Sequence, residues 1–147
     1  MFLYAADLGS GKVSALTINT ITGALSTVSG SPYSVGSYPQ SIATDPSGDL
    51  LYVANNYSTI NNIFAFSIDS FTGALATVIG SPFVAGEDPN SVTVDPSGTF
   101  VYVVNSFSGT ISEFSIISTT GGLSVVSGSP FSAGIGVNSM TTSGKIQ

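Results

Sequence analysis

Short apolar segments separated by polar turns recur along the chain with a period of about fifty residues. The clearest unit places a short strand at 41–44, an apolar strand at 50–54, an alternating strand at 63–68 and a last strand at 74–78. A continuous apolar run is typical of a strand buried on both faces, and strict alternation of one with a single buried face. No segment has the apolar period of an amphipathic helix.

The same turn motif follows the first strand in two of the units. It reads Asp45-Pro46-Ser47-Gly48 in one unit and Asp95-Pro96-Ser97-Gly98 in the next. Asp can bond to its own backbone, Pro fixes φ, and Gly permits a positive φ, so both stretches are predicted to be tight turns. Four short antiparallel strands in each unit predict an all-β fold built from β-propeller blades.

The two ends of the chain divide one of the units between them. Residues 31–80 and 81–128 each form a complete blade, 1–30 supply strands two to four of a split blade, and 129–147 supply its innermost strand. We therefore expect residues 1–147 to be a single propeller segment with three blades. Each blade must bury its faces against its neighbours, because a single blade cannot form a core.

The composition is apolar and almost free of charge. Of the residues 42% are hydrophobic and 7% are charged, against roughly 25% charged in average soluble proteins. The mean hydropathy of +0.44 indicates that much surface is hidden in a core or against partners. The chain has no Cys, so it forms no disulfide, and no run of roughly 18 apolar residues that would span a membrane as a helix.

The net charge of −6 excludes two classes of partner. The only cationic side chains are Lys12 and Lys145, because the chain has no Arg. Nucleic-acid binding requires a cluster of basic residues that displaces counterions from phosphates, and docking to anionic lipid requires the same. Neither function fits this sequence.

The repeat resembles a known family at particular motifs. These are Pro39-x-Ser41-x-x-x-Asp45-Pro46-Ser47-Gly48 followed by Leu51-Tyr52-Val53-Ala54-Asn55, and in the next copy Pro89 followed by Val101-Tyr102-Val103-Val104-Asn105. Over its whole length, three blades' worth, the chain is similar to the lactonase-type seven-bladed β-propeller family, also described by its YVTN repeats. For enzymes of that family the resemblance implies a site with His, Arg and Glu that acts on anionic sugar-acid or diacid substrates. This chain has no His and no Arg, so those roles map onto no residue here.

The acidic residues do not form a convincing catalytic or metal site. Asp45 and Asp95 are predicted to cap their turns rather than to act as paired acids. Glu87-Asp88 is the only adjacent acidic pair, and calcium needs about six to eight oxygen ligands in a suitable loop. Glu113 is interpreted as a solvated charge at a strand edge. Without His or Cys we expect no zinc, no nucleophile–base pair, no cofactor and no assigned catalytic residue.

Three amide side chains are the weak candidates for ligand binding. Gln40, Asn90 and Asn138 occupy the same place in each copy, just before the innermost strand. If that strand lines the central channel, the amides form a ring that could bind a small polar ligand. Structural hydrogen bonding at the start of the strand is the alternative interpretation, and the one we favour.

Three functional hypotheses fit these observations. The first is a non-enzymatic scaffold or binding module, exported or on the cell surface, that presents Ser, Thr and Asn side chains to proteins or glycans. Low charge and the missing catalytic residue types favour it. The second is a degenerate or partial lactonase acting on a neutral sugar lactone, and the third is a structural subunit of a surface layer or filament.

Three blades leave strand edges and apolar faces in water, so we expect further association. Pairing the end of one copy with the start of another would complete the split blade, and two copies would close a ring of six. The homodimer is the favoured partner, with the missing blades of a longer chain as the alternative. Residues 1–4 lack the basic start and apolar stretch of a signal peptide, so either export is not encoded here or the chain is a mature or internal piece.

Overall fold

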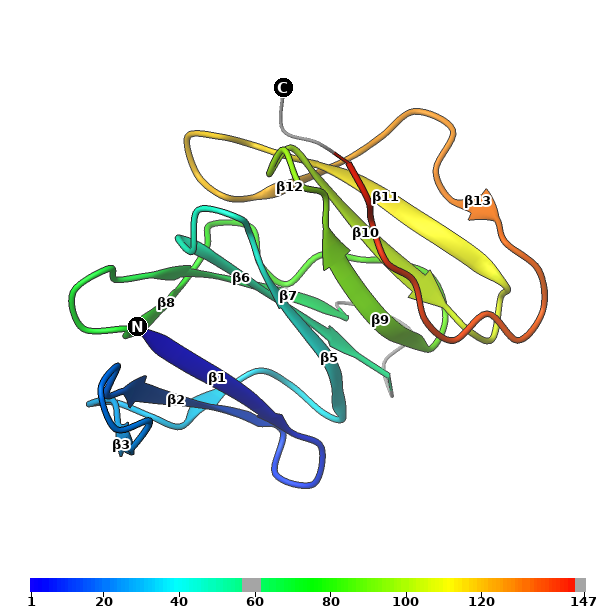
Figure 1. The fold of residues 1–147 in the computed structure, drawn as a ribbon. Coiled ribbons are helices and arrows are strands. Elements are labelled where there is room, and N and C mark those ends of the chain that lie inside the picture. Colours follow the sequence, from blue (N-terminus) through cyan, green and yellow to red (C-terminus); the bar gives the residue numbers. More distant parts are fainter. Residues whose placement is uncertain (57–61, 145–147) are drawn as a thin grey trace.

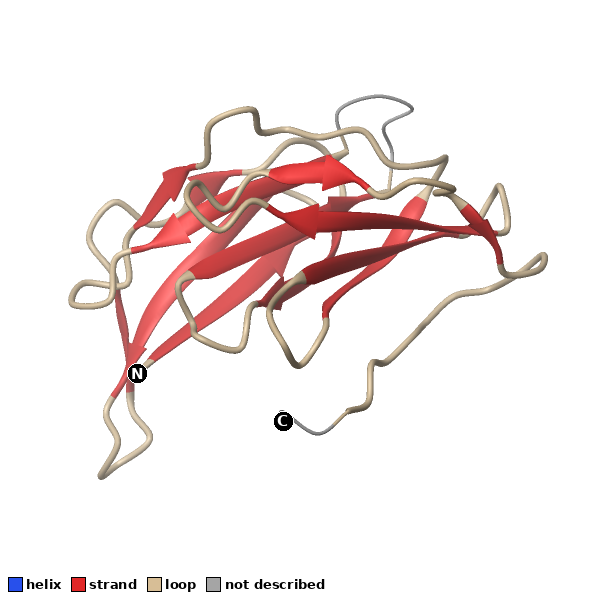
Figure 2. Cartoon of the chain, turned by 90° about the horizontal axis from the view of Figure 1, so that it is seen from above, coloured by secondary structure: helices blue, strands red, loops and turns tan. Residues whose placement is uncertain are grey.

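The computed structural model describes residues 1–56 and 62–144, which form three antiparallel sheets stacked one beside the next (Figure 1). Within these residues all regular structure is strand, as the red arrows of Figure 2 show. It follows that no described helix has the length and apolar character to cross a membrane. The predicted all-β fold of propeller blades is confirmed. Most of the loop predicted between 55 and 62, and Lys145, lie outside the described residues.

Within each sheet the strands pair in the order of the sequence, except that β4 pairs with β2 and β13 pairs with β11. The first sheet contains β1 (Phe2–Asp7), β2 (Lys12–Ile18), β3 (Leu25–Thr27) and β4 (Tyr33–Ser34). The second contains β5 (Pro39–Thr44), β6 (Leu50–Asn55), β7 (Ile63–Ile68) and β8 (Leu75–Thr77). The third contains β9 (Pro89–Val94), β10 (Phe100–Asn105), β11 (Thr110–Ile116), β12 (Leu123–Val125) and β13 (Phe131–Ser132). The innermost strands of the second and third sheets are therefore β5 and β9, and the first sheet begins with the counterpart of β6.

The outermost strand of each sheet is interrupted and then resumes. In the first sheet Leu16 pairs with Thr27 of β3, and further along the same strand Val13 pairs with Tyr33 of β4. A cis Ser-Pro bond lies in the interruption, and β13 and Phe83 return in the same way to β11 and β7. The predicted division between residues 30 and 31 falls inside this outer strand. Pro lacks a donor, and the edge of a sheet tolerates it.

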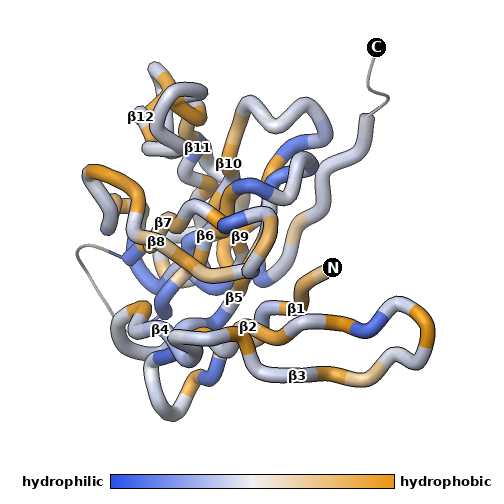
Figure 3. The backbone as a smooth tube through the Cα atoms, turned by 90° about the vertical axis from the view of Figure 1, so that its left-hand side faces the viewer, coloured by the Kyte–Doolittle hydropathy of each residue, from blue (hydrophilic) through white to orange (hydrophobic). Residues whose placement is uncertain are grey.

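Two apolar clusters hold the sheets together, and β6 contributes to both. Leu51 and Val53 lie in the cluster between the first and second sheets, while Tyr52 and Ala54 lie in the cluster between the second and third. All four side chains are fully buried. This burial on both faces explains the continuous apolar run of the sequence. Figure 3 shows orange, apolar segments recurring along the strands, and orange also at the tip of the hairpin between β2 and β3.

The segment 137–144 runs beside β9, where it takes the place that β9 takes beside β5 (Figure 1). Thr142 Oγ1 donates a hydrogen bond to the carbonyl oxygen of Val94 at 3.2 Å, and the side chains of Asn90 and Asn138 are hydrogen-bonded. The segment is not a regular strand in this structure. Because β1 packs against β5 and this segment against β9, the two parts of the split blade lie at opposite ends of the stack.

Candidate functional site

The three candidate amides lie where the innermost strands begin, and we call this the amide end of the sheets. Asn90 Nδ2 donates a hydrogen bond to Asn138 Oδ1, so the structure brings these two side chains into contact between β9 and the neighbouring segment 137–144. Gln40 lies at the matching position of β5 with its side chain exposed. The structure therefore joins two of the three amides directly.

One atom of this group lacks a partner within the described residues. Asn90 Oδ1 is buried and accepts no hydrogen bond. A buried acceptor without a donor costs free energy, and such groups are rare in native structures. A hydroxyl group of a ligand or a water molecule at this place would satisfy it.

The backbone immediately before the amides is strained. Tyr38 and Asp88, two residues before Gln40 and Asn90, have positive φ angles of 54° and 52°. Side chains with a Cβ seldom adopt this region, and such residues gather at functional sites. The carbonyl of Tyr38 accepts a bond from Asn56 N at 2.9 Å, and that of Asp88 accepts one from Ser106 N at 3.0 Å. These bonds hold the connections that place the amides.

Two buried asparagines, Asn55 and Asn105, lie behind the amide end. Both belong to the repeat motif of the sequence, which assigns them no role. Asn105 Oδ1 accepts a bond from Gly86 N at 3.0 Å, and its Nδ2 donates to Ser112 Oγ at 2.9 Å and Thr110 Oγ1 at 3.1 Å. Asn55 Nδ2 donates to the carbonyl of Val35. Both side chains fix the connection that leads into the innermost strand of their own sheet. The signal in the sequence is a polar residue that ends the same apolar run in two copies.

The first sheet has an acid where the other two have these asparagines. Asp7 accepts bonds from Ser10 Oγ at 2.7 Å and Gly9 N at 3.0 Å, which hold the turn after β1. The hydrogen bonds from Ser10 and Gly9 lower the pKa of the Asp7 carboxyl. The Asp7 carboxylate therefore stabilises its own turn.

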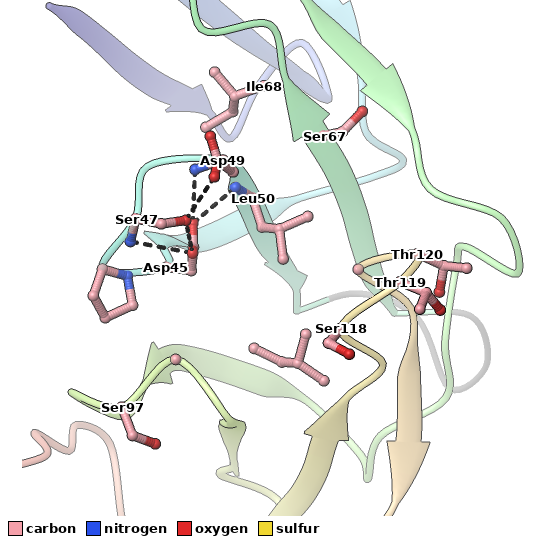
Figure 4. A pocket seen from close by; sticks show the side chains of 14 residues that line it. Asp45, Ser47, Asp49, Leu50, Ser67, Ile68, Ser97, Ser118, Thr119 and Thr120 are labelled. Carbon is pink, nitrogen blue, oxygen red and sulfur yellow. Dashed lines mark hydrogen bonds between the residues drawn. The ribbon is translucent and has the colours of Figure 1, made fainter.

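A pocket of about 580 Å³ lies at the opposite end, where the turns of the second and third sheets meet (Figure 4). Leu50, Ile68 and Ile116 give it apolar walls, and Asp49 and Thr119 are among its polar lining residues. This combination could hold a small polyol. The pocket is open and its hydroxyl groups are not focused on one point.

Asp45 also lines this pocket, where it caps its turn as predicted. Its Oδ1 accepts bonds from Asp49 N at 2.9 Å and Leu50 N at 2.8 Å, and its Oδ2 accepts bonds from the backbone and hydroxyl of Ser47. Asp95 makes the matching set of bonds in the next turn. The prediction of turn capping is confirmed for both residues.

The remaining acids do not assemble into a metal site. Among residues 1–56 and 62–144 no three His, Cys, Asp or Glu side chains gather as a metal ion would need. Glu113 lies opposite Tyr102 in the register of β10 and β11. Burial raises the pKa of Tyr102, and the negative charges of Glu113 and Asp95 raise it further.

Three stacked antiparallel sheets, with their innermost strands side by side, define a segment of a β-propeller. The model of the lactonase, 7-bladed beta-propeller, family matches residues 1–87 and 59–137. The chain belongs to this family.

Similar proteins carry names from the same family. The chain is 42% identical over 67 residues to a 6-phosphogluconolactonase of Formosa agariphila, a match that covers 44% of the chain and 18% of the relative. Its fold is similar to the crystal structure of a provisionally assigned 6-phosphogluconolactonase of Bacteroides fragilis, with a TM-score of 0.79 at 20% identity over 90% of the chain and 36% of that protein. It is also similar to the periplasmic gluconolactonase of Pseudomonas aeruginosa, with a TM-score of 0.74 at 22% identity over 88% and 38%. The chain thus spans well under half the length of these proteins.

The first functional hypothesis from the sequence, a non-enzymatic scaffold or binding module, is wrong. The family to which the chain belongs and the relatives that it matches are named as lactonases. The hypothesis gave too much weight to the missing His and Arg of a chain that spans only part of its relatives. The expected position outside the cell stays a prediction.

Proposed function

We propose that this chain forms three consecutive blades of a lactonase that hydrolyses a sugar lactone. The observation that carries the proposal is the family match from residue 1 to residue 137, supported by 42% identity to a relative named 6-phosphogluconolactonase. In the reaction, water adds to the carbonyl carbon, the ring C–O bond breaks, and the ring oxygen takes a proton. The product is the open-chain sugar acid.

The amide end is the part of this chain best suited to hold such a substrate. A sugar lactone presents several hydroxyl groups, each a donor and an acceptor, and amide side chains complement both. The side chain of Gln40 is exposed, so its amide is open to a substrate hydroxyl. Asn138 lies in contact with Asn90, and Gln40 occupies the matching place one strand away. We assign these three residues to substrate binding.

A neutral lactone fits the charges of this chain better than a phosphorylated one. Glu87 and Asp88 directly precede the Pro89-Asn90 start of β9, and their negative charges would repel a phosphate group. Lys12, the one lysine within the described residues, lies in β2 of the first sheet. We therefore expect the unphosphorylated gluconolactone type to be the substrate.

The experiment is a titration of the acid released from glucono-δ-lactone and from 6-phosphoglucono-δ-lactone, after subtraction of the spontaneous rate. We expect the purified chain to accelerate hydrolysis of the neutral lactone. A rate equal to the spontaneous rate with both lactones would refute hydrolysis by this chain. Faster turnover of the phosphorylated lactone would refute the preference for a neutral substrate.

The place of binding is tested with one variant and one control. Asn90→Ala removes the amide that is hydrogen-bonded to Asn138 at the amide end, so KM should rise by about tenfold, the effect of one hydrogen bond. Ser124→Ala changes an exposed hydroxyl on β12 and should leave KM unchanged. Equal KM values for the two variants would exclude the amide end as the binding site.

A further inference from the structure

A tyrosine–glycine hydrogen bond joins the first sheet to the second and the second to the third, with the same spacing in the sequence. Tyr4 Oη donates to the carbonyl oxygen of Gly73 at 2.9 Å, and Tyr52 Oη donates to that of Gly121 at 3.0 Å. The two partners are 69 residues apart in both cases. The repeat contains a third tyrosine of this series, Tyr102 on β10, and a third glycine, Gly23 in the first sheet. The same bond can therefore form once more, between two chains.

The three glycines share a backbone conformation but not an environment. Their φ angles are 74°, 73° and 74° for Gly23, Gly73 and Gly121. A Cβ on Gly73 would lie 2.3 Å from Phe2 Cδ1, and a Cβ on Gly121 would lie 2.3 Å from Leu50 Cδ2. A Cβ on Gly23 would meet nothing within 4 Å. The residue that follows Phe2 and Leu50 in the series is Phe100, at the start of β10.

The face of the first sheet that points away from the second sheet is apolar and uncovered, and we call it the leading face. Leu3 is 36% exposed, whereas its counterpart Leu51 is fully buried. Leu25 is 51% exposed, whereas its counterpart Leu75 is 9% exposed. The counterparts are covered by a neighbouring sheet, so the leading face has the composition of a face that packs against another sheet.

Among residues 1–56 and 62–144, no strand pairs with the inner edge of β1. In the complete sheets the innermost strand pairs antiparallel with the next, and Ile42 lies opposite Val53 as Val92 lies opposite Val103. The first sheet begins with β1, which pairs on one side only, with β2. In the repeat, Met140 occupies the position equivalent to Val92, and Ala5 occupies the position equivalent to Val103. A strand formed by 138–142 would thus set Met140 opposite Ala5.

We propose that a second copy of this chain docks head to tail onto the leading face. The docking surface that it offers is the trailing face, which consists of Phe100, Tyr102 and the segment 137–144. Tyr102 Oη of one copy bonds to the carbonyl of Gly23 in the next, Phe100 covers that glycine, and residues 138–142 pair with β1. Each chain already contains this junction twice, so the new contact continues an existing packing.

The mass in solution is the first test. We expect light scattering to give twice the 14.8 kDa of one chain, or a higher multiple if more copies close the ring. A mass of 14.8 kDa at every concentration would overturn the proposal. The measurement does not involve lactone hydrolysis, so it can fail while the proposed function stands, and the reverse also holds.

A matched pair of glycine variants tests the surface itself. Gly23→Ala should weaken association more than tenfold, because the new methyl group would occupy the place of Phe100. Gly48→Ala is the control, since Gly48 has a φ of 80° and open space around it but lies away from the proposed junction. Both variants carry the same backbone strain. Equal association of the two variants would overturn the proposal.

Cross-linking tests the register between residues 138–142 of one copy and β1 of the next. Because the natural chain has no Cys, only the introduced thiols can form a disulfide. Mixing an Ala5→Cys variant with a Met140→Cys variant should give a disulfide between the two chains under mild oxidation. Replacing Ala5→Cys by Ala6→Cys moves the thiol to the other face of β1, so the yield should drop severalfold. Equal yields, or no cross-link in the first pair, would overturn the register.

Discussion

Ser81 Oγ accepts a hydrogen bond from the backbone N–H of Ala65 at 2.9 Å, at the point where the outer strand of the second sheet is interrupted. The same relationship occurs in the other two sheets, and in all three the partners are 16 residues apart. The other pairs are Ser31 with Ala15 and Ser129 with Glu113. The serine of the Ser-Pro pair thus replaces a backbone acceptor that the interrupted strand cannot supply.

Removing this hydroxyl should destabilise the chain. In Ser81→Ala the N–H of fully buried Ala65 loses its acceptor, which should lower the free energy of unfolding by about 1–3 kcal/mol. Urea denaturation measures the change. Ser124→Ala, an exposed hydroxyl, should stay within about 0.5 kcal/mol of the wild type. Equal midpoints for the two variants would contradict the proposed role of Ser81.

The contact between Gly73 and Phe2 leads to a second prediction. Gly73→Ala places a methyl group 2.3 Å from the Phe2 ring, so the first and second sheets must separate or the ring must move. The decrease in the free energy of unfolding should be larger than that of Gly48→Ala by about 1–3 kcal/mol, the usual cost of overpacking. Thermal unfolding of both variants gives the comparison. A Gly48→Ala protein that melts at or below the Gly73→Ala temperature would argue against this contact.

The turn at Asp69 contributes to the acid dependence of stability. The backbone and hydroxyl of Thr72 and the backbone of Phe71 donate hydrogen bonds to Asp69, and these bonds lower its pKa below the usual 3.8. A lowered folded-state pKa gives stability that is present above the unfolded pKa and is lost as pH falls through the folded pKa. The contribution of Asp69 should therefore vanish as the pH is lowered from about 5 to below 3.

Asp69→Asn should remove this pH dependence while the turn is kept. The first sheet provides the precedent, because Asn19 Oδ1 accepts the matching bonds from Ile21 N at 2.9 Å and Thr22 N at 3.1 Å. Denaturation midpoints measured from pH 7 to pH 2.5 should fall less in Asp69→Asn than in the wild type. Parallel curves for the two proteins would show that Asp69 does not contribute.

The strands and the Asp-Pro-Ser-Gly turns could be predicted from the sequence, because their signals are local. Alternating or continuous apolar runs identify β6 and β7, and a turn motif of four residues identifies the capping role of Asp45. The two-residue strands β4 and β13 could not be predicted, since so short a segment has no apolar period.

The contacts that shape the amide end could not be predicted from the sequence either, because they join residues far apart in the chain. Asn105 bonds to Gly86, 19 residues earlier, and Asn90 bonds to Asn138, 48 residues later. The repeat shows that these positions correspond, but it does not show that Asn90 and Asn138 touch while Gln40 stays exposed. That difference depends on how neighbouring innermost strands pack.

Asn105 gives the last prediction, since it is fully buried and makes three bonds. In Asn105→Ala the N–H of Gly86 and the hydroxyls of Ser112 and Thr110 lose this partner, so the free energy of unfolding should fall by about 2–4 kcal/mol. Asn55→Ala is the matched comparison, because within the described residues the side chain of Asn55 bonds to the carbonyl of Val35 and its Oδ1 has no partner. The decrease in the free energy of unfolding of Asn55→Ala should be smaller than that of Asn105→Ala by at least about 1 kcal/mol. Chemical denaturation ranks the two variants, and a larger loss in Asn55→Ala would show that these bonds do not determine the stability of the connection.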